Sequence, residues 1–159
     1  MAHAYTVEFF LDDDGSSPVA RWITEELTAA ERRAVTVALS ELVGEMGQDI
    51  CSTDFGKNIG GGLIELRLRQ SEEQILHRIG KKSVEPRARD EAVAVLLRVF
   101  FHPHGDKRIL VLHGYSKKDI SSKQRQQAEV QLARKRLAKW RARTRQEGRF
   151  KKRPPPKGA

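Results

Sequence analysis

Ala92 to Phe101 reads AVAVLLRVFF, and Arg108 to Tyr115 reads RILVLHGY. Both runs are rich in β-branched and aromatic residues, which favour strands over exposed helices. Between them, His102 to Asp106 (HPHGD) has the composition of a turn. We therefore predict a hairpin of two buried strands, in which Arg98 is the one charge that interrupts the first strand.

A third run, Leu63 to Arg69 (LIELRLR), alternates apolar and charged residues with a period of two. Successive side chains of a strand point to opposite faces of the sheet. We predict a strand whose leucines face the core, while Glu65, Arg67 and Arg69 share the outward face.

The N-terminal part of the chain predicts one strand and two helices. Tyr5 to Leu11 (YTVEFFL) has strand composition and ends at the turn Asp12 to Gly15. Ser17 and Pro18 suit the cap and first residue of a short helix, Pro18 to Leu27. A capping box from Thr28 to Glu31 begins a second helix. Its apolar residues recur at helical spacing and need a surface to cover: Val35, Leu39, Leu42 and Met46.

The remaining segments complete an α+β fold. Gly47 to Gly62 has loop composition, and Gln70 to Glu91 is a polar insertion that we expect to be mobile. A long basic helix is expected from Ser121 onward, followed by a disordered Pro-containing tail, Phe150 to Ala159. The expected domain spans residues 1–143 and the tail residues 144–159. It contains a small antiparallel sheet, two N-terminal helices and the long C-terminal helix.

Charge is concentrated at the C-terminal end. The 159 residues carry a formal charge of +9, yet residues 116–159 hold 16 Lys and Arg against 3 Asp and Glu. Such a block favours polyanions, namely nucleic acid, the ribosome or an acidic protein surface, although a solvated helix face with a solubilising tail has the same composition.

The single cysteine, Cys51, excludes an internal disulfide and a cysteine-rich zinc site. No apolar run is long enough for a membrane helix or a secretion signal, so we expect a soluble cytoplasmic protein with no membrane partner.

Three segments together resemble a known family. They are Leu63–Arg69 (LIELRLR), Leu97–Phe101 (LRVFF) and Leu112–Lys118 (LHGYSKK). They are similar to the HigB-type, phage-derived host-inhibition branch of the RelE/ParE toxin superfamily, where an ELR strand, an RVxY/F strand and an LHGFxKK strand end line one concave face. The resemblance covers about Tyr5 to Leu137, without the insertion.

The resemblance implies a fold, an activity and partners. The fold would be a RelE-like antiparallel sheet with helices packed on its other face. The activity would be ribosome-associated cleavage of messenger RNA, which inhibits translation and places the protein near the 16S and 23S rRNA surfaces. The partner would be a neutralising antitoxin of helix-turn-helix type. This chain has Phe100 and Phe101 where the family's second motif usually has a tyrosine, so a catalytic phenol would have to come from Tyr115.

Cleaving RNA without a metal or cofactor needs a base, an acid and cations around the phosphate. On the resemblance, Arg67, Arg98 and Lys117 would stabilise the phosphate, with Lys118 in support. His113 and Tyr115 lie two residues apart on one strand, so they would share a face and could supply acid, base or a stacking surface. Structural roles compete: Arg67 and the two lysines as surface charge, Arg98 paired with Glu65, and His113 as a packing residue.

Further cations suit an RNA partner. Arg69 and nine residues of the last helix supply them: Lys123, Arg125, Arg134, Lys135, Arg136, Lys139, Arg141, Arg143 and Arg145. Trp140 among them could stack on a base or pack under the helix.

The insertion, Gln70 to Glu91, could act as a lid or antitoxin contact, or be a solvated loop. Two other functions remain open: a ParE-like inhibitor of DNA gyrase, and a noncatalytic basic RNA-binding protein.

Overall fold

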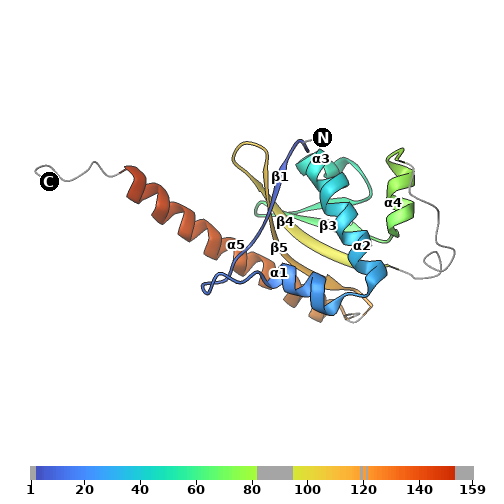
Figure 1. Cartoon of the computed structure of the whole chain (residues 1–159). Coiled ribbons are helices and arrows are strands. Elements are labelled where there is room, and N and C mark those ends of the chain that lie inside the picture. Colours follow the sequence, from blue (N-terminus) through green and yellow to red (C-terminus); the bar gives the residue numbers. More distant parts are fainter. Residues whose placement is uncertain (1–2, 82–94, 119, 121, 153–159) are drawn as a thin grey trace, which may run out of the picture.

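Five strands form one sheet: β1 (Thr6–Phe9), β2 (Gly56–Gly60), β3 (Leu63–Leu68), β4 (Leu97–His104) and β5 (Arg108–Ser116). Their order is β1-β5-β4-β3-β2, and all pairs are antiparallel except β1 with β5 (Figure 1). The computed structural model describes residues 3–81, 95–118, 120 and 122–152. The mixed α/β class is confirmed. The predicted antiparallel pairing is confirmed for β2 to β5. It is wrong for β1, which no hairpin joins to β5 and which pairs with it in parallel.

The N-terminal helical region begins where its caps predict and is divided into more segments than the two helices expected. The α1 helix (Pro18–Arg21) continues into a π-helical turn, η1 (Trp22–Glu26). After Thr28, α2 (Ala29–Val37) leads through the π-helical η2 (Ala38–Val43) and α3 (Gly44–Met46) to the 3₁₀ segment η3 (Gly47–Ser52). The Thr28 hydroxyl accepts from the Glu31 backbone N–H at 3.2 Å, and the Glu31 carboxylate accepts from the Thr28 N–H at 3.0 Å.

Both faces of the sheet are covered. One core lies beneath the N-terminal helices and includes the fully buried Leu66, Val99 and Val111 of the three central strands. A second core on the opposite face joins strand residues such as Phe100 and Leu112 to Leu137 of the last helix. The α5 helix (Lys123–Lys152) thus packs on the same face as the charged residues of β3. The resemblance had implied helices on the other face alone.

Two elements lie where the sequence predicted none. β2 falls in the expected loop, because its mostly exposed residues and two glycines give no apolar alternation. The α4 helix (Glu72–Arg78) lies in the insertion that we expected to be mobile. It has its own capping box between Ser71 and Gln74, and it buries Ile75 completely in the core. Residues 82–94 of the predicted insertion and strand lie outside the described residues.

The ends of two other elements also differ from prediction. β4 continues through His102 and His104, which were expected in a turn, and the chain reverses at 105–107, where Gly105 and Lys107 have positive φ angles of 55° and 54°. Glycine adopts this conformation without steric cost. The α5 helix continues to Lys152, beyond the expected end of the domain, and its C-terminal part runs out past the sheet (Figure 1). Its residues after 143 contain one glycine and no proline, so nothing there stops a helix. Residues 153–159 of the expected tail are outside the described part.

Gly114 shows how tightly the motif strand packs against the N-terminal helices. A Cβ placed on Gly114 would lie 2.3 Å from the Trp22 indole ring. We expect Gly114→Ala to destabilise the fold by about 1–3 kcal/mol, because the buried ring has little room to move. Denaturant-induced unfolding measures this cost.

The matched control is the same substitution in a Trp22→Phe background, where the offending part of the indole is removed. There we expect Gly114→Ala to cost less, a coupling that a double-mutant cycle measures. Equal costs in both backgrounds would contradict this packing.

Candidate active site

The three motif strands bring the predicted site residues into one cross-strand row. β3, β4 and β5 are neighbours, and their register pairs Arg67 with Arg98 and Arg98 with Tyr115. The next row toward α5 consists of Glu65, Phe100 and His113. Directly paired residues share a face of the sheet, so both rows lie on the face that α5 partly covers.

Among the residues that the structure describes, Glu65 is the carboxylate that pairs with both guanidinium groups. Arg67 Nε donates to Glu65 Oε1 at 2.7 Å, and Arg98 Nε lies 4.0 Å from the same oxygen. Glu65 is almost fully buried, while about a third of the Arg67 side chain is exposed (35%). Two positive charges therefore meet one negative charge, which leaves the row cationic.

Arg98 is buried without a complete set of partners. Its side chain is 6% exposed, and its Nη1 atom has no hydrogen-bond partner among the described residues. Burial lowers the pKa of the Arg98 guanidinium, and the charge of Glu65 opposes this by raising it. An arginine still remains protonated at neutral pH. A buried cationic donor with no acceptor is costly, and an anion that reached it would remove that cost.

Tyr115 supplies the phenol of this row. It is buried against Phe100, with ring centroids 6.1 Å apart. Burial raises the pKa of the Tyr115 hydroxyl, and the negative charge of Glu65 raises it further. The hydroxyl is therefore protonated at neutral pH, which suits a proton donor and not a base.

His113 lies on the same face, but α5 occupies both of its ring nitrogens. Its Nε2 hydrogen-bonds to Glu129, and its Nδ1 lies 3.1 Å from Nη1 of Arg136. The ring also stacks on Phe100 with centroids 6.3 Å apart. Burial lowers the pKa of His113, and the hydrogen bond to Glu129 opposes that shift. These contacts favour the packing role over the catalytic role that the sequence left open.

Lys117 and Lys118 follow β5 at the edge of the row. The Lys117 backbone N–H donates to the Leu96 carbonyl at 2.8 Å, which extends the pairing of β4 and β5 beyond Ser116. Lys117 is half-buried and Lys118 is exposed. Lys117 comes two residues after Tyr115, the interval that keeps strand side chains on one face.

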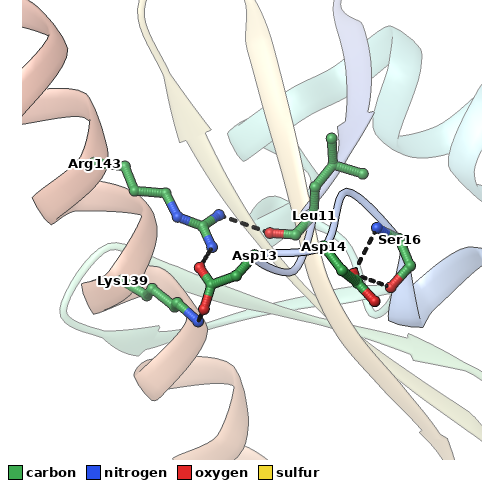
Figure 2. Close-up of polar contacts among 6 residues, drawn as sticks. All are labelled: Leu11, Asp13, Asp14, Ser16, Lys139 and Arg143. Carbon is green, nitrogen blue, oxygen red and sulfur yellow. Dashed lines mark hydrogen bonds and ion pairs between the residues drawn. The ribbon is translucent and has the colours of Figure 1, made fainter.

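Two cations of α5 bind the segment that follows β1. Arg143 and Lys139 both bind Asp13, each at 2.6 Å, and Arg143 also donates to the Leu11 carbonyl at 2.7 Å (Figure 2). These hydrogen bonds lower the pKa of Asp13. The nearby Asp14 accepts from the backbone and hydroxyl of Ser16, which shapes the turn before α1.

Arginines of α5 also bind backbone carbonyls of the strands. Arg134 donates to the Ile59 carbonyl at 2.8 Å and the Gly60 carbonyl at 3.0 Å, and Arg141 donates to Gly61 at 3.0 Å. Arg136 donates to the Leu112 carbonyl. Arg134, predicted to bind RNA, is therefore engaged by the β2–β3 turn. Four other cations predicted to bind RNA are exposed: Arg69, Lys123, Arg125 and Lys135.

Two groups of polar residues do not follow from the sequence. Glu65, the acidic residue of the ELR motif, binds Arg67 as well as lying beside Arg98. Separately, one ligand atom each from His3, Glu41 and Glu45 lie within 4.8 Å of one another. Long sequence separation hid this group, and its members already pair, His3 with Glu45 and Glu41 with Lys81.

The lowered pKa of His113 predicts an acid-dependent loss of stability. As pH falls through the ordinary histidine value of 6.5, the unfolded chain takes up the proton before the folded chain does. The free energy of unfolding should therefore decrease with falling pH in this range. Glutamine can donate to Glu129 and accept from Arg136, so His113→Gln should fold and reduce the pH dependence.

Denaturant unfolding between pH 5 and 8 measures this effect, with exposed His77→Gln as the matched control. An unchanged pH dependence in the folded His113→Gln variant would contradict the assignment.

Comparison with known proteins does not place the chain in a family. No family model matches the sequence, and no curated protein matches it. Within the described residues, none of the helices combines the length and the apolar character needed to cross a membrane. The motifs and the geometry of the site are therefore the observations that bear on its function.

Proposed function

We propose that this protein is an RNA-cleaving toxin of a toxin–antitoxin pair, with the row Arg67, Arg98 and Tyr115 at its active site. The proposal rests on its resemblance to the HigB-type branch of the RelE/ParE superfamily. It is supported by one observation above all: the residues of three separate motifs are paired across adjacent strands. The fold would then be RelE-like, with α5 as an added layer.

The charges of the row suit a phosphodiester. Glu65 balances one of the two guanidinium groups, and the unmet Nη1 of Arg98 offers a donor to a phosphate oxygen. Guanidinium groups bind phosphate through paired hydrogen bonds, which fixes the orientation as well as the charge. Lys117 and Lys118 add positive charge where the row meets solvent.

The chemistry can be written without a metal. The 2′-oxygen attacks the phosphorus while its proton passes to the Glu65 carboxylate. The bond from phosphorus to the 5′-oxygen breaks, and this oxygen takes the proton of the Tyr115 hydroxyl. Arg67 and Arg98 stabilise the additional negative charge of the pentacovalent state. The products are a 2′,3′-cyclic phosphate and a 5′-hydroxyl end.

Access to the row sets the order of contacts. Arg67, Lys117 and Lys118 are reachable from solvent, whereas Arg98 and Tyr115 are covered. RNA would first contact the exposed cations, and its phosphate would then have to reach the buried Arg98. On the family resemblance, the ribosome presents the message in the cytoplasm, and a helix-turn-helix antitoxin blocks the site.

Replacing Arg98 tests the proposal. In a translation reaction with ribosomes and a defined message, the unaltered protein should cut the message. Arg98→Ala should be slower by about 10²- to 10³-fold, the usual cost of one group that stabilises transition-state charge. Thermal unfolding checks that this variant is folded. Arg98→Lys keeps the buried charge beside Glu65 and should also cleave more slowly, because an ammonium group lacks the paired donors of a guanidinium. Arg21→Ala, which removes an exposed cation from α1, is the matched control and should retain the rate.

This experiment and two further assays distinguish the proposed activity from the two alternatives. An intact message in the presence of ribosomes would overturn the proposal. Stalled DNA gyrase with intact message would favour a ParE-like inhibitor. Loss of all activity on replacing the exposed α5 cations Lys123 and Lys135 by glutamate, with no effect of Arg67 or Arg98 substitution, would favour a noncatalytic basic RNA-binding protein.

Tyr115→Phe tests the proposed acid, because it removes only the hydroxyl. We expect cleavage to slow by about 10²- to 10⁴-fold, with unchanged RNA affinity in a fluorescence-anisotropy titration. Unchanged thermal unfolding would show that the packing against Phe100 is kept. A Tyr115→Phe variant with the full cleavage rate would remove the phenol from the mechanism.

A further inference from the structure

A second surface of the protein has the chemistry of a nucleotide site. A pocket of about 560 Å³ lies along the part of α5 that carries Trp140. Its lining residues are Ala138, Trp140, Arg141, Thr144 and Arg145. Sites for small ligands typically occupy a few hundred to a thousand cubic ångströms, so one or two nucleotides would fit this space.

The Trp140 indole is held in place by two histidine rings of β4. Its ring centroid lies 4.6 Å from that of His104 and 5.7 Å from that of His102. His102 is itself fixed by a hydrogen bond from Nδ1 to the Gly62 carbonyl at 2.5 Å. Burial lowers the pKa of both histidines, so these rings are neutral at pH 7. Trp140 remains half-buried, and the part of it that lines the pocket is available to a ligand.

The charges beside this ring are positive. Arg141 and Arg145 lie one helical turn apart on the pocket wall, and no carboxylate is among the lining residues that the structure describes. Arg141 uses one nitrogen to bind Gly61. For Arg145, the described residues include no ion-pair or hydrogen-bond partner, in contrast to Lys139 and Arg143, which bind Asp13.

We propose that this pocket binds single-stranded RNA, with one base stacked on Trp140 and its phosphates on Arg141 and Arg145. An unpaired base can reach an aromatic side chain, whereas a base within a duplex cannot. The site is separate from the Arg67–Arg98–Tyr115 row. It takes from the proposed function only that the ligand is RNA, and it requires no cleavage.

Tryptophan fluorescence tests this proposal on the full chain. A Trp22→Phe variant leaves Trp140 as the only tryptophan, and it is titrated with a single-stranded oligoribonucleotide of eight uridines. We expect quenching that a duplex of the same length does not produce. Trp140→Ala should weaken binding roughly 5- to 150-fold, measured by anisotropy of labelled RNA.

Charge reversal at an exposed residue guards against a folding defect in Trp140→Ala. Arg145→Glu should weaken binding about tenfold more than Arg21→Glu, which makes the same change on the opposite face. Equal effects of these two variants, no quenching, or equal quenching by the duplex would overturn the proposal. An Arg98→Ala variant separates the two sites: it should lose cleavage and keep the quenching. Quenching that disappears with Arg98 would place the RNA at the sheet and contradict a second site.

Discussion

The pairing of one carboxylate with two guanidinium groups on a covered sheet face constrains this structure. Glu65 and Arg98 are both nearly excluded from solvent, and neither charge could be buried alone without a large cost. They can meet only if β3 and β4 keep their observed register, because a shift by one residue would turn one of them toward the apolar core under the N-terminal helices. The pairing of Glu65 with Arg98 therefore favours the observed register of β3 and β4.

The same face explains why α5 is so basic. Leu137 and Ala133 are its fully or nearly fully buried contacts with the sheet, a narrow apolar strip for a helix of 30 residues. Long cationic side chains extend the contact sideways and donate to backbone carbonyl groups of the strands and turns. Arg134 and Arg141 bind the turn between β2 and β3 in this way, and Arg143 binds the Leu11 carbonyl in the segment that follows β1. High positive charge in this helix is therefore partly structural and only partly available to a polyanion.

The sequence predicts the central part of this fold well. Strong alternation at Leu63–Leu68 and dense apolar residues from Leu97 indicate strands, because these patterns follow directly from burial of one or both faces. Weakly patterned elements escape such reasoning: β2 is mostly exposed, and α4 buries only Ile75 fully. Parallel pairing of β1 is also hidden, since it depends on where a distant segment packs and not on local residues.

The candidate site was predictable to a similar extent. The row of Arg67, Arg98 and Tyr115 follows from motif order and strand periodicity, and the register confirms that these residues lie side by side. The sequence did not indicate that Glu129 and Arg136 bind the two ring nitrogens of His113. Both residues belong to α5, and the face of this helix that packs on the sheet has little apolar pattern. That Arg67 and Arg98 share the Glu65 carboxylate did not follow from the sequence either, because this arrangement depends on how β3 and β4 pair.

We propose that Arg98, buried beside Glu65, receives a phosphate. The most direct measurement is nitrogen NMR of the arginine guanidinium groups during titration with uridine 3′-monophosphate, a mimic of the cleaved end. We expect the Arg98 signals to shift, and the exchange of its guanidinium protons with water to slow as the unpaired Nη1 gains an acceptor. Arg98 signals that stay unchanged while only α5 cations respond would contradict it.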